Sequence, residues 1–382
     1  SQRLIAHGHK VTMVCGNTTM SDTFDRSGDK VTELDIDGIR VLRIDATYSN
    51  SLSNRARALG FVQFALTAGR VAASCKGDVV FATSTPLTVG IPGTIAKWRS
   101  RAPFVFEVRD LWPDLPIAMG GITNPAVIFA LRRLERFTYA RADHIVALAP
   151  GMKDGVVASG YPAEDVTTIP NGCDTDLFLP SDEPLTDPRF SAGSDGIRLV
   201  YPGAIGNANG LGDVFDSLVE LNRRGEGGIH LHLIGGGSEK AELQARRTSD
   251  GLEKYVTFHD PIPKLELAEL LPRFDLGLMS LRNVPEFHYG TSPNKFFDYL
   301  AAGLPVINNY PGWVAGLIED NKCGVVVPPE SPTELADALV SLRESKGDLV
   351  AMGRNSRTLA GTEFSRDRLG DLFVSTLEAA AS

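Results

Sequence analysis

Residues 288–306 read HYGTSPNKFFDYLAAGLPV and combine the beginning of a helix with the strand that follows it. Pro293 suits the first turn of a helix, and Ser292 is the kind of side chain that caps one. The pattern therefore predicts a helix over 293–302 and a strand over 306–308. A strand-helix alternation of this kind is typical of α/β proteins with parallel sheets.

The first turn of this helix is a candidate phosphate site. Asn294 and Lys295 would lie where free N–H groups and the helix dipole favour an anion, and Lys295 adds a full positive charge. Asp298 follows three residues later on the same helical face, where a carboxylate can accept two hydrogen bonds from a ribose diol. The alternative is an exposed Lys–Asp pair with no ligand. The candidate nucleotide-binding residues are Tyr289, Gly290, Thr291, Ser292, Asn294, Lys295 and Asp298.

The same alternation of short apolar runs and helical patterns extends in both directions from this stretch. In the second half the predicted strands are 197–201, 229–234, 256–259, 276–279, 306–308 and 324–327, and the predicted helices are 211–223, 239–246, 264–271, 293–302, 332–343 and 366–380. In the first half the predicted strands are 11–15, 39–44, 79–82, 104–108 and 144–148, and the predicted helices are 55–73, 89–100 and 126–140.

The segment 180–196 is rich in Pro, Ser, Asp and Gly and reads as a linker between domains. The sequence therefore predicts an α/β protein of two Rossmann-like domains, 1–180 together with 366–382, and 181–365. Their parallel sheets are expected to face a central cleft, where such folds bind ligands. Because the chain begins with a helical pattern followed by a strand, the first strand of the N-terminal domain is expected to be missing.

Two glycine-rich loops each follow a predicted strand and precede a helix. The first contains Gly203 and Asn207, and the second contains Gly235 and Gly236. Glycines let a backbone approach a ligand closely, and the next helix offers free N–H groups. The alternative is that these glycines serve only tight turns. Neither loop has the G-x-G-x-x-G spacing of a dinucleotide site, which argues against an NAD-dependent dehydrogenase.

Composition narrows the class of protein. The formal charge of −9 argues against nucleic-acid binding. The four cysteines are far apart, with no metal-binding spacing, and indicate reduced thiols and a cytoplasmic protein. The apolar runs are shorter than the roughly 18 residues that a membrane span needs.

In their order along the chain, these stretches resemble the retaining glycosyltransferases of family 4, which have the GT-B fold. The resemblance rests on RLIAHGHKVTMVCG, FVFEVRDLWPD, IPNGCDTDLF, LIGGGSEK, SPNKFFDYLAAGLPVI and GVVVPPESPTELADAL. RDLWPD and PNKFFDYLAAG are most similar to the branch that builds bacterial O-antigen and capsule with amino sugars of the fucosamine type. The resemblance implies transfer from a nucleoside diphosphate sugar, UDP-linked, to a lipid-linked or glycan acceptor in cell-surface polysaccharide synthesis. The donor is a substrate, and neither a cofactor nor a metal is expected.

The resemblance also implies roles for individual residues. Asp298 falls where the second glutamate of the family's E-x7-E motif holds the ribose, whereas the first glutamate would fall at Gly290 and is absent. The family's Arg and Lys on the first glycine loop are missing, and Asn207 occupies that stretch, so Lys295 is expected to carry the phosphate charge. Arg109 and Asp110 follow the predicted strand 104–108.

At this strand end, Arg109 is expected to contact the donor or an acceptor phosphate, and Asp110 to orient the attacking hydroxyl. The alternative is that the two only pair with each other. The catalytic candidates are therefore Arg109, Asp110 and Lys295.

Other functions remain open at this stage. A nucleotide-sugar epimerase of the same fold would bind the same donor, and a non-catalytic partner subunit is suggested by the glycine at position 290. Arg132, Arg133, Arg136 and Arg141 make a basic face on the predicted helix 126–140. This face is either merely solvated or in peripheral contact with anionic lipid at the inner face of the plasma membrane.

Overall fold

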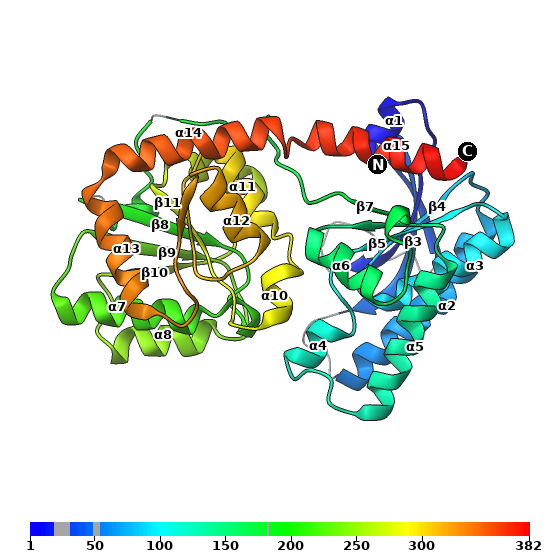
Figure 1. Cartoon of the computed structure of the whole chain (residues 1–382), viewed down its shortest axis with the longest axis horizontal. Helices are drawn as coiled ribbons and strands as arrows, with labels where there is room; N and C mark the ends of the chain where they lie inside the picture. Colours follow the sequence, from blue (N-terminus) through cyan, green and yellow to red (C-terminus); the bar gives the residue numbers. More distant parts are fainter. Residues whose placement is uncertain (19–30, 49–53, 182, 194) are drawn as a thin grey trace. The chain divides into compact units, whose positions relative to one another are not determined.

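The computed structural model describes residues 1–18, 31–48, 54–181, 183–193 and 195–382. The chain divides into two compact units, drawn in Figure 1. Unit 1 contains Ser1–Ile169 and Gly370–Ser382, and unit 2 contains Pro170–Leu369. Residues that follow Ile169 directly already belong to unit 2, because Cys173 and Phe178 are fully buried in its core. The chain therefore passes into unit 2 before the segment 180–196.

Unit 2 is built on one six-stranded, all-parallel sheet with the order β10-β9-β8-β11-β12-β13. The strands are β8 (Ile197–Pro202), β9 (Ile229–Ile234), β10 (Val256–His259), β11 (Leu276–Met279), β12 (Val306–Asn308) and β13 (Gly324–Val326). Numbered from β8, this order is 3-2-1-4-5-6, the doubly wound order of nucleotide-binding folds.

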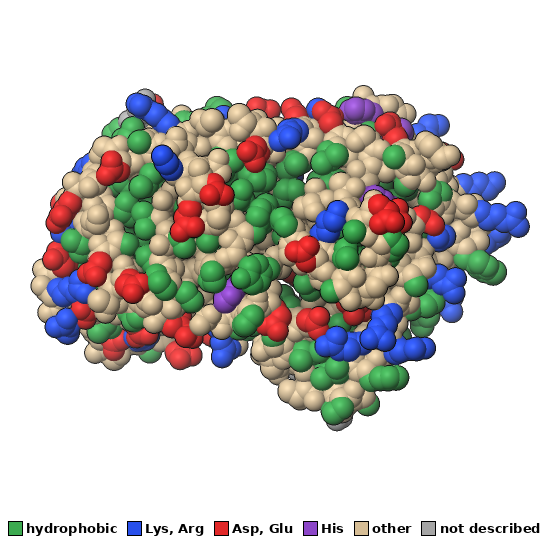
Figure 2. Space-filling view, viewed as in Figure 1, with side chains coloured by type: hydrophobic (Ala, Val, Ile, Leu, Met, Phe, Trp, Pro, Cys, Tyr) green, Lys and Arg blue, Asp and Glu red, His purple; other side chains and the backbone are tan. Residues whose placement is uncertain are grey.

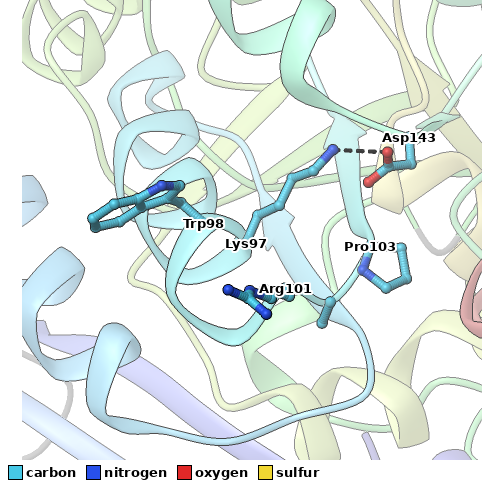
Figure 3. A pocket seen from close by; sticks show the side chains of 6 residues that line it. Lys97, Trp98, Arg101, Pro103 and Asp143 are labelled. Atoms are coloured by element: carbon cyan, nitrogen blue, oxygen red, sulfur yellow. Dashed lines mark hydrogen bonds and ion pairs between the residues drawn. The ribbon is translucent and has the colours of Figure 1, made fainter.

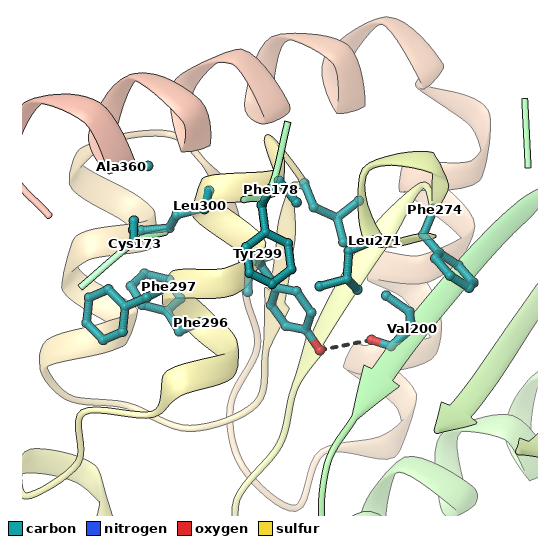
Figure 4. Close-up of a cluster of buried hydrophobic side chains, with 14 of the residues drawn as sticks. Cys173, Phe178, Val200, Leu271, Phe274, Phe296, Phe297, Tyr299, Leu300 and Ala360 are labelled. Atoms are coloured by element: carbon teal, nitrogen blue, oxygen red, sulfur yellow. Dashed lines mark hydrogen bonds between the residues drawn. The ribbon is translucent and has the colours of Figure 1, made fainter. Parts of the chain in front are cut away.

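Helices cover both faces of this sheet. They are α7 (Leu211–Arg224), α8 (Lys240–Ser249), α9 (Lys264–Leu270), α10 (Pro285–Tyr289), α11 (Asn294–Ala302), α12 (Trp313–Asp320), α13 (Pro332–Glu344) and α14 (Lys346–Thr362). One apolar cluster joins the sheet to α9, α11, α12 and part of α14, and a second joins it to α7, α8 and α13. Figure 4 shows part of the first cluster, where the fully buried Tyr299 of α11 donates its hydroxyl to the Val200 carbonyl at 3.0 Å.

Unit 1 contains a four-stranded parallel sheet and a three-stranded sheet. The first has the order β4-β5-β6-β7, with β4 (Val80–Thr83), β5 (Phe104–Val108), β6 (His144–Ala147) and β7 (Val166–Thr168). The second has the order β1-β3-β2, with β1 (Thr12–Thr18), β2 (Val31–Ile36) and β3 (Ile39–Tyr48). Strand β2 is antiparallel to β3 and was not predicted. Asp37 and Gly38 join these strands with φ of 52° and 80°, the positive values that a tight hairpin turn requires.

The helices of unit 1 are α1 (Gln2–Ala6), α2 (Asn54–Ser74), α3 (Gly90–Ser100), α4 (Asp114–Ala118), α5 (Pro125–Arg141) and α6 (Pro150–Ala158). The last helix, α15 (Arg366–Ala381), contributes its residues from Gly370 onward to this unit. There the Arg3 guanidinium lies 2.6 Å from the Asp371 carboxylate, and the Phe81 and Phe373 rings meet edge to face at 4.9 Å.

The predicted α/β class is confirmed. The strands predicted in the second half match the observed ones to within a residue at each end. The sequence did not predict α4, α6, α10, α12 or α14, or the strands β2 and β7. No helix among the described residues combines the length and the apolar character needed to span a bilayer.

Candidate active site

The sheet order of unit 2 identifies where a ligand is expected. Between β8 and β11 the strand order reverses, and doubly wound folds bind ligands at this point, outside the carboxyl ends of the strands. Gly203 follows β8, and Ser280 follows β11. The Ser280 hydroxyl donates to the Asn209 carbonyl at 2.8 Å, which ties the two loops together. Among the nucleotide-binding residues predicted from the sequence, Gly203 and Asn207 lie in the loop after β8, and Gly235 and Gly236 follow β9. The others lie between the end of α10 and the second turn of α11.

The two glycine-rich loops pack directly against each other. The Gly203 N–H donates to the Ile234 carbonyl and the Ile205 N–H to the Gly236 carbonyl, both at 2.9 Å. A Cβ atom on Gly235 would lie 1.9 Å from the Gly203 carbonyl oxygen, so no side chain fits there. Gly236 has no such restriction, since the nearest atom to its Cβ position is 4.0 Å away. Gly235 is thus required by the packing of one loop on the other.

Lys295 extends from the first turn of α11 to the loop that follows β8. Its Nζ lies 3.4 Å from the centre of the buried Tyr201 ring. The same nitrogen is 3.4 Å from the position that a Cβ on Gly203 would occupy. The Tyr201 hydroxyl donates to the Ala204 carbonyl at 3.0 Å, so one tyrosine supports both the ammonium and the loop. The Lys295 ammonium therefore lies next to the glycine-rich backbone of the loop that follows β8.

Burial lowers the pKa of Lys295 to about 7, from an ordinary value near 10.5. Between these two values the unfolded chain binds a proton that the folded chain does not, so the free energy of unfolding rises with pH in this window. We expect a gain of about 2 kcal/mol between about pH 7 and pH 9 from this group. Urea unfolding of the native chain and of Lys295→Met at both pH values measures it. An equal pH dependence in the two proteins would show that Lys295 titrates normally.

The beginning of α11 differs in detail from the prediction. The helix begins at Asn294, and Pro293 is its N-cap residue, with no side-chain cap. Ser292 was predicted as the cap, but its hydroxyl instead accepts a hydrogen bond from the Asn171 backbone N–H at 3.0 Å. The Asn171 side chain also donates to the Ser292 carbonyl, so the two segments are held together twice. Asn294 remains exposed at the first turn.

The other residues predicted before α11 lie in or next to α10. Tyr289 is its last residue and is 60% exposed, whereas Gly290, which follows it, is buried. The Thr291 hydroxyl donates to the Phe287 carbonyl at 3.1 Å. Tyr289 is therefore the side chain here that is most open to a ligand.

Asp298 is largely buried and has different neighbours from Lys295. Its carboxylate lies 3.8 Å from the Lys264 ammonium, which is 2.7 Å from Asp174. Asp174 is also paired with Arg366. Burial raises the pKa of Asp298 to about 6, and Lys264 acts in the opposite direction. Among the described residues no ion pair joins Lys295 to Asp298, which argues against the exposed Lys–Asp pair considered above.

Three basic residues around this site were not predicted from the sequence. Arg282, just after β11, donates from its side chain to Asn207 at 3.0 Å and from its backbone to the Ala208 carbonyl at 3.0 Å. Lys240 donates to the Gly235 carbonyl at 2.9 Å and to the His259 carbonyl at 3.1 Å. Lys264, which contacts Asp298, is the third. The loop that lacks its own Arg or Lys therefore receives a guanidinium from a neighbouring strand end.

In unit 1, the predicted catalytic residues Arg109 and Asp110 follow β5, whose carboxyl end lies next to that of β4. The Arg109 guanidinium is 3.9 Å from the Glu107 carboxylate, which also accepts a hydrogen bond from Thr83. Asp110 accepts from the Thr85 hydroxyl at 3.4 Å. Burial raises the pKa of both Glu107 and Asp110, against the effect of Arg109. Arg109 thus pairs with Glu107 and not, as the alternative had it, with Asp110.

The paired histidines of β9 serve the structure of unit 2. His230 bonds the Lys254 carbonyl and the Thr257 hydroxyl, both at 2.8 Å. His232 bonds His259 at 3.0 Å and the Ala192 carbonyl at 3.1 Å. Both ring nitrogens of each histidine are occupied by protein atoms.

Comparison with known proteins relates both units to glycosyltransferases. Residues 1–172 match the family described as glycosyl transferase 4-like domain, and residues 196–345 match glycosyl transferases group 1. A GDP-mannose-dependent alpha-(1-6)-phosphatidylinositol monomannoside mannosyltransferase of Mycobacterium tuberculosis is 26% identical over 300 residues, 76% of this chain and 73% of that protein. The probable glycosyltransferase WbjE of Pseudomonas aeruginosa is 22% identical over 325 residues, 83% of this chain and 78% of that protein.

Solved structures agree on the fold. HepE of Anabaena in complex with UDP superposes with a TM-score of 0.65 at 16% identity, over 89% of this chain and 86% of that one. Sucrose-phosphate synthase of Thermosynechococcus elongatus gives a TM-score of 0.75 at 17% identity, over 100% and 92%. The two domain matches place the chain among glycosyltransferases of the family 4 type, and the solved structures share its GT-B fold.

Proposed function

We propose that this glycosyltransferase transfers a sugar from a nucleoside diphosphate donor bound by unit 2 to a lipid-linked or glycan acceptor bound by unit 1. The observation that carries the proposal is the partly buried Lys295 ammonium beside the glycine-rich loop at the reversal point of the sheet. A partly buried cation in the first turn of a helix, where backbone N–H groups have no partner within the helix, is the environment that a diphosphate requires.

The proposed reaction retains configuration at the anomeric carbon. The bond from that carbon to the diphosphate oxygen breaks, and a bond to the acceptor hydroxyl oxygen forms on the same face of the sugar. The hydroxyl proton passes to the departing diphosphate. Lys295 and the first turn of α11 would lower the barrier by stabilising the charge that develops on the diphosphate, without a metal ion.

Asp298 would hold the ribose diol, with Lys264 keeping the carboxylate in place. Tyr289, Thr291 and Asn294 would line the donor site near the beginning of α11. In unit 1, Asp110 would orient the acceptor hydroxyl, and Arg109 would contact a phosphate of the acceptor or donor. Glu107 is the carboxylate that holds Arg109.

For the donor we propose a UDP-linked, N-acetylated amino sugar used in cell-surface polysaccharide synthesis. UDP is the nucleotide in the HepE structure, whereas the M. tuberculosis relative is named for GDP-mannose. The identity of the nucleotide in the donor, UDP or GDP, is therefore the first part of the proposal to test.

Thermal unfolding with UDP, GDP, ADP and TDP tests the proposal. At about 100 times its dissociation constant, the correct diphosphate should raise the free energy of unfolding by about 2.7 kcal/mol. We expect UDP to do so, and a GDP response alone would replace UDP with GDP in the proposal. If none of the four stabilises the chain, unit 2 has no donor site and a non-catalytic role gains support. Product analysis with donor but no acceptor separates a transferase from an epimerase, which would release an altered sugar nucleotide.

A further inference from the structure

Unit 2 has more acidic than basic side chains, so it can hold an anion only where cations gather. Between Pro170 and Leu369 the sequence has 29 Asp and Glu against 19 Lys and Arg. Figure 2 shows Asp and Glu side chains spread over the visible face of this unit. A donor diphosphate in unit 2 therefore needs local positive charge that no carboxylate already neutralises.

The cations near the glycine-rich loops differ in whether a carboxylate neutralises them. Lys240 and Lys264 are each paired with a carboxylate, at 3.0 Å and 2.7 Å. Lys295 and Arg282, by contrast, form no ion pair with any residue that the structure describes. Lys295 already has a place in the proposed donor site. Arg282 is therefore a second free positive charge at the reversal point of the sheet, without an assigned role.

The backbone at Arg282 is fixed on the loop that follows β8. The Arg282 N–H donates to the Ala208 carbonyl at 3.0 Å. Two residues earlier, the Ser280 hydroxyl donates to the Asn209 carbonyl at 2.8 Å. Gly210 has a φ of 58°, and a Cβ atom on it would lie 2.8 Å from the Arg282 nitrogen. This close packing gives the Arg282 side chain a defined starting point beside the loop.

The Arg282 guanidinium is directed over the same loop. One of its Nη atoms donates to Asn207 Oδ1 at 3.0 Å, and the side chain is otherwise exposed. Burial raises the pKa of Glu239 and Asp213, and the positive charge of Arg282 opposes the rise at both carboxyls. Because an amide orients a guanidinium without neutralising it, the charge of Arg282 remains available to an anionic ligand.

Backbone N–H groups of the loop between these two cations also lack partners. Lys295 meets the beginning of the loop, and Arg282 meets it further along the chain. Among the residues described, neither the Ala204 N–H nor the Gly206 N–H has a hydrogen-bond acceptor, whereas the Ile205 N–H between them is bonded to the second loop. Free N–H groups between two cations offer a phosphate both hydrogen bonds and charge.

The order of these groups indicates which phosphate Arg282 would contact. Asp298, proposed to hold the ribose, lies about one turn after Lys295 on α11. Lys295 reaches the loop at Gly203, and Arg282 meets the same loop further on, at Asn207. A donor whose ribose lies at Asp298 would therefore meet Lys295 first and Arg282 second.

A surface hollow in unit 1 does not offer the same chemistry. It has a volume of about 460 Å³ and is lined by Lys97, Trp98, Arg101, Ala102, Pro103 and Asp143. Figure 3 shows the Lys97 ammonium directed to Asp143, which lies 2.7 Å away. That carboxylate would repel a diphosphate, and no glycine is among the lining residues. The positive charge of this hollow is therefore no substitute for Arg282.

We propose that Arg282 binds the distal phosphate of the donor, which carries the sugar, and that Asn207 is the positioning residue that orients its guanidinium. The proposal rests on the donor site of the proposed function and adds a contact to it. When the bond from the anomeric carbon to the distal phosphate oxygen breaks, the electron pair of that bond remains on this oxygen. Arg282 would stabilise this charge before the proton of the acceptor hydroxyl reaches it.

Isothermal titration of the full chain with UDP and UMP tests the role of Arg282, since UMP lacks the distal phosphate. Arg282→Gln should weaken UDP binding roughly 20-fold, because a charge-assisted contact is lost. The same variant should change UMP affinity less than about twofold. Arg282→Lys keeps the charge without the planar fork and should lose only about fivefold in UDP affinity. If GDP stabilises the native chain instead, GDP and GMP replace UDP and UMP.

The control for lost positive charge is Arg354→Gln. Arg354 is an exposed arginine of α14, and its replacement should leave UDP affinity unchanged. Because the Arg282 side chain is exposed, Arg282→Gln without nucleotide should unfold at the same urea concentration as the native chain. A loss of UDP affinity in Arg282→Gln would then not reflect a loss of folding.

A double-mutant cycle tests the role of Asn207. Asn207→Ala should weaken UDP binding roughly fivefold in the native chain, because the guanidinium loses its hydrogen-bond acceptor. In the Arg282→Gln background the same substitution should have no further effect. A merely structural role of Asn207 in the loop would instead cost the same affinity in both backgrounds and would remove it as the positioning residue.

The outcomes separate this proposal from the one on which it rests. If the native chain binds UDP and Arg282→Gln binds it equally well, Arg282 is not part of the donor site, although the site itself stands. If Arg282→Gln weakens UDP and UMP binding equally, Arg282 does not contact the distal phosphate. If the native chain binds neither UDP nor GDP, the donor site fails, and the role of Arg282 fails with it.

Discussion

Replacing Lys295 with methionine is expected to weaken binding of the donor nucleotide roughly 100-fold, or by about 2.7 kcal/mol. Its ammonium lies beside the Gly203 loop, in a partly buried position where a diphosphate would be poorly hydrated. Charge-assisted contacts in such positions are much stronger than contacts at an exposed surface. Isothermal titration with the nucleotide that stabilises the native chain measures the loss, and sugar transfer should fall with it.

The design separates a binding defect from a folding defect. Because burial of the Lys295 charge opposes folding near neutral pH, the methionine variant without ligand should be at least as stable as the native chain. Lys346→Met serves as the control, since Lys346 is exposed at the beginning of α14. Unchanged nucleotide affinity in Lys295→Met, together with normal affinity in the control, would remove Lys295 from the donor site.

Gly235→Ala is expected to lower the free energy of unfolding by about 3 kcal/mol and to abolish donor binding. Its Cβ would lie 1.9 Å from the Gly203 carbonyl oxygen, so the two glycine-rich loops must separate. The Gly203 N–H to Ile234 carbonyl bond at 2.9 Å would be strained in the process. Guanidinium unfolding measures the stability, and titration with the nucleotide measures the binding.

The neighbouring residue provides the control for this substitution. In Gly236→Ala the added Cβ has no atom closer than 4.0 Å, so we expect a change below about 0.5 kcal/mol. If Gly235→Ala were as stable as Gly236→Ala, the close packing of the two loops would not be needed for the fold. If it were destabilised but still bound the nucleotide, the loop would have no part in the donor site.

A helix or strand could be predicted where the pattern in its own short stretch of sequence determines it. The strands of unit 2 are short apolar runs between turn residues, and the prediction found them all. Helix α14 was missed, since Gly347, Gly353 and Gly361 interrupt its helical pattern and it is held by packing against α11. Strand β2 is only partly buried, but Asp37-Gly38 between it and β3 is a hairpin signal that was available in the sequence.

Individual contacts in the candidate site could not be predicted where they join residues that are far apart in the sequence. Helical spacing placed Lys295 and Asp298 on one side of α11, yet one lies over Tyr201 and the other beside Lys264. Arg282 reaches Asn207 across 75 positions of sequence. Such contacts arise from the strand order, and no pattern within a short window of sequence contains them.

The division of the chain into units has a consequence for synthesis. Unit 2 is one continuous segment, Pro170–Leu369, whereas unit 1 combines Ser1–Ile169 with Gly370–Ser382. A ribosome therefore delivers all of unit 2 before it delivers the helix that contacts Arg3 and Phe81 of unit 1. Residues 1–169 must wait for Gly370–Ser382 before the packing of unit 1 is complete, so we expect unit 1 to finish folding after unit 2.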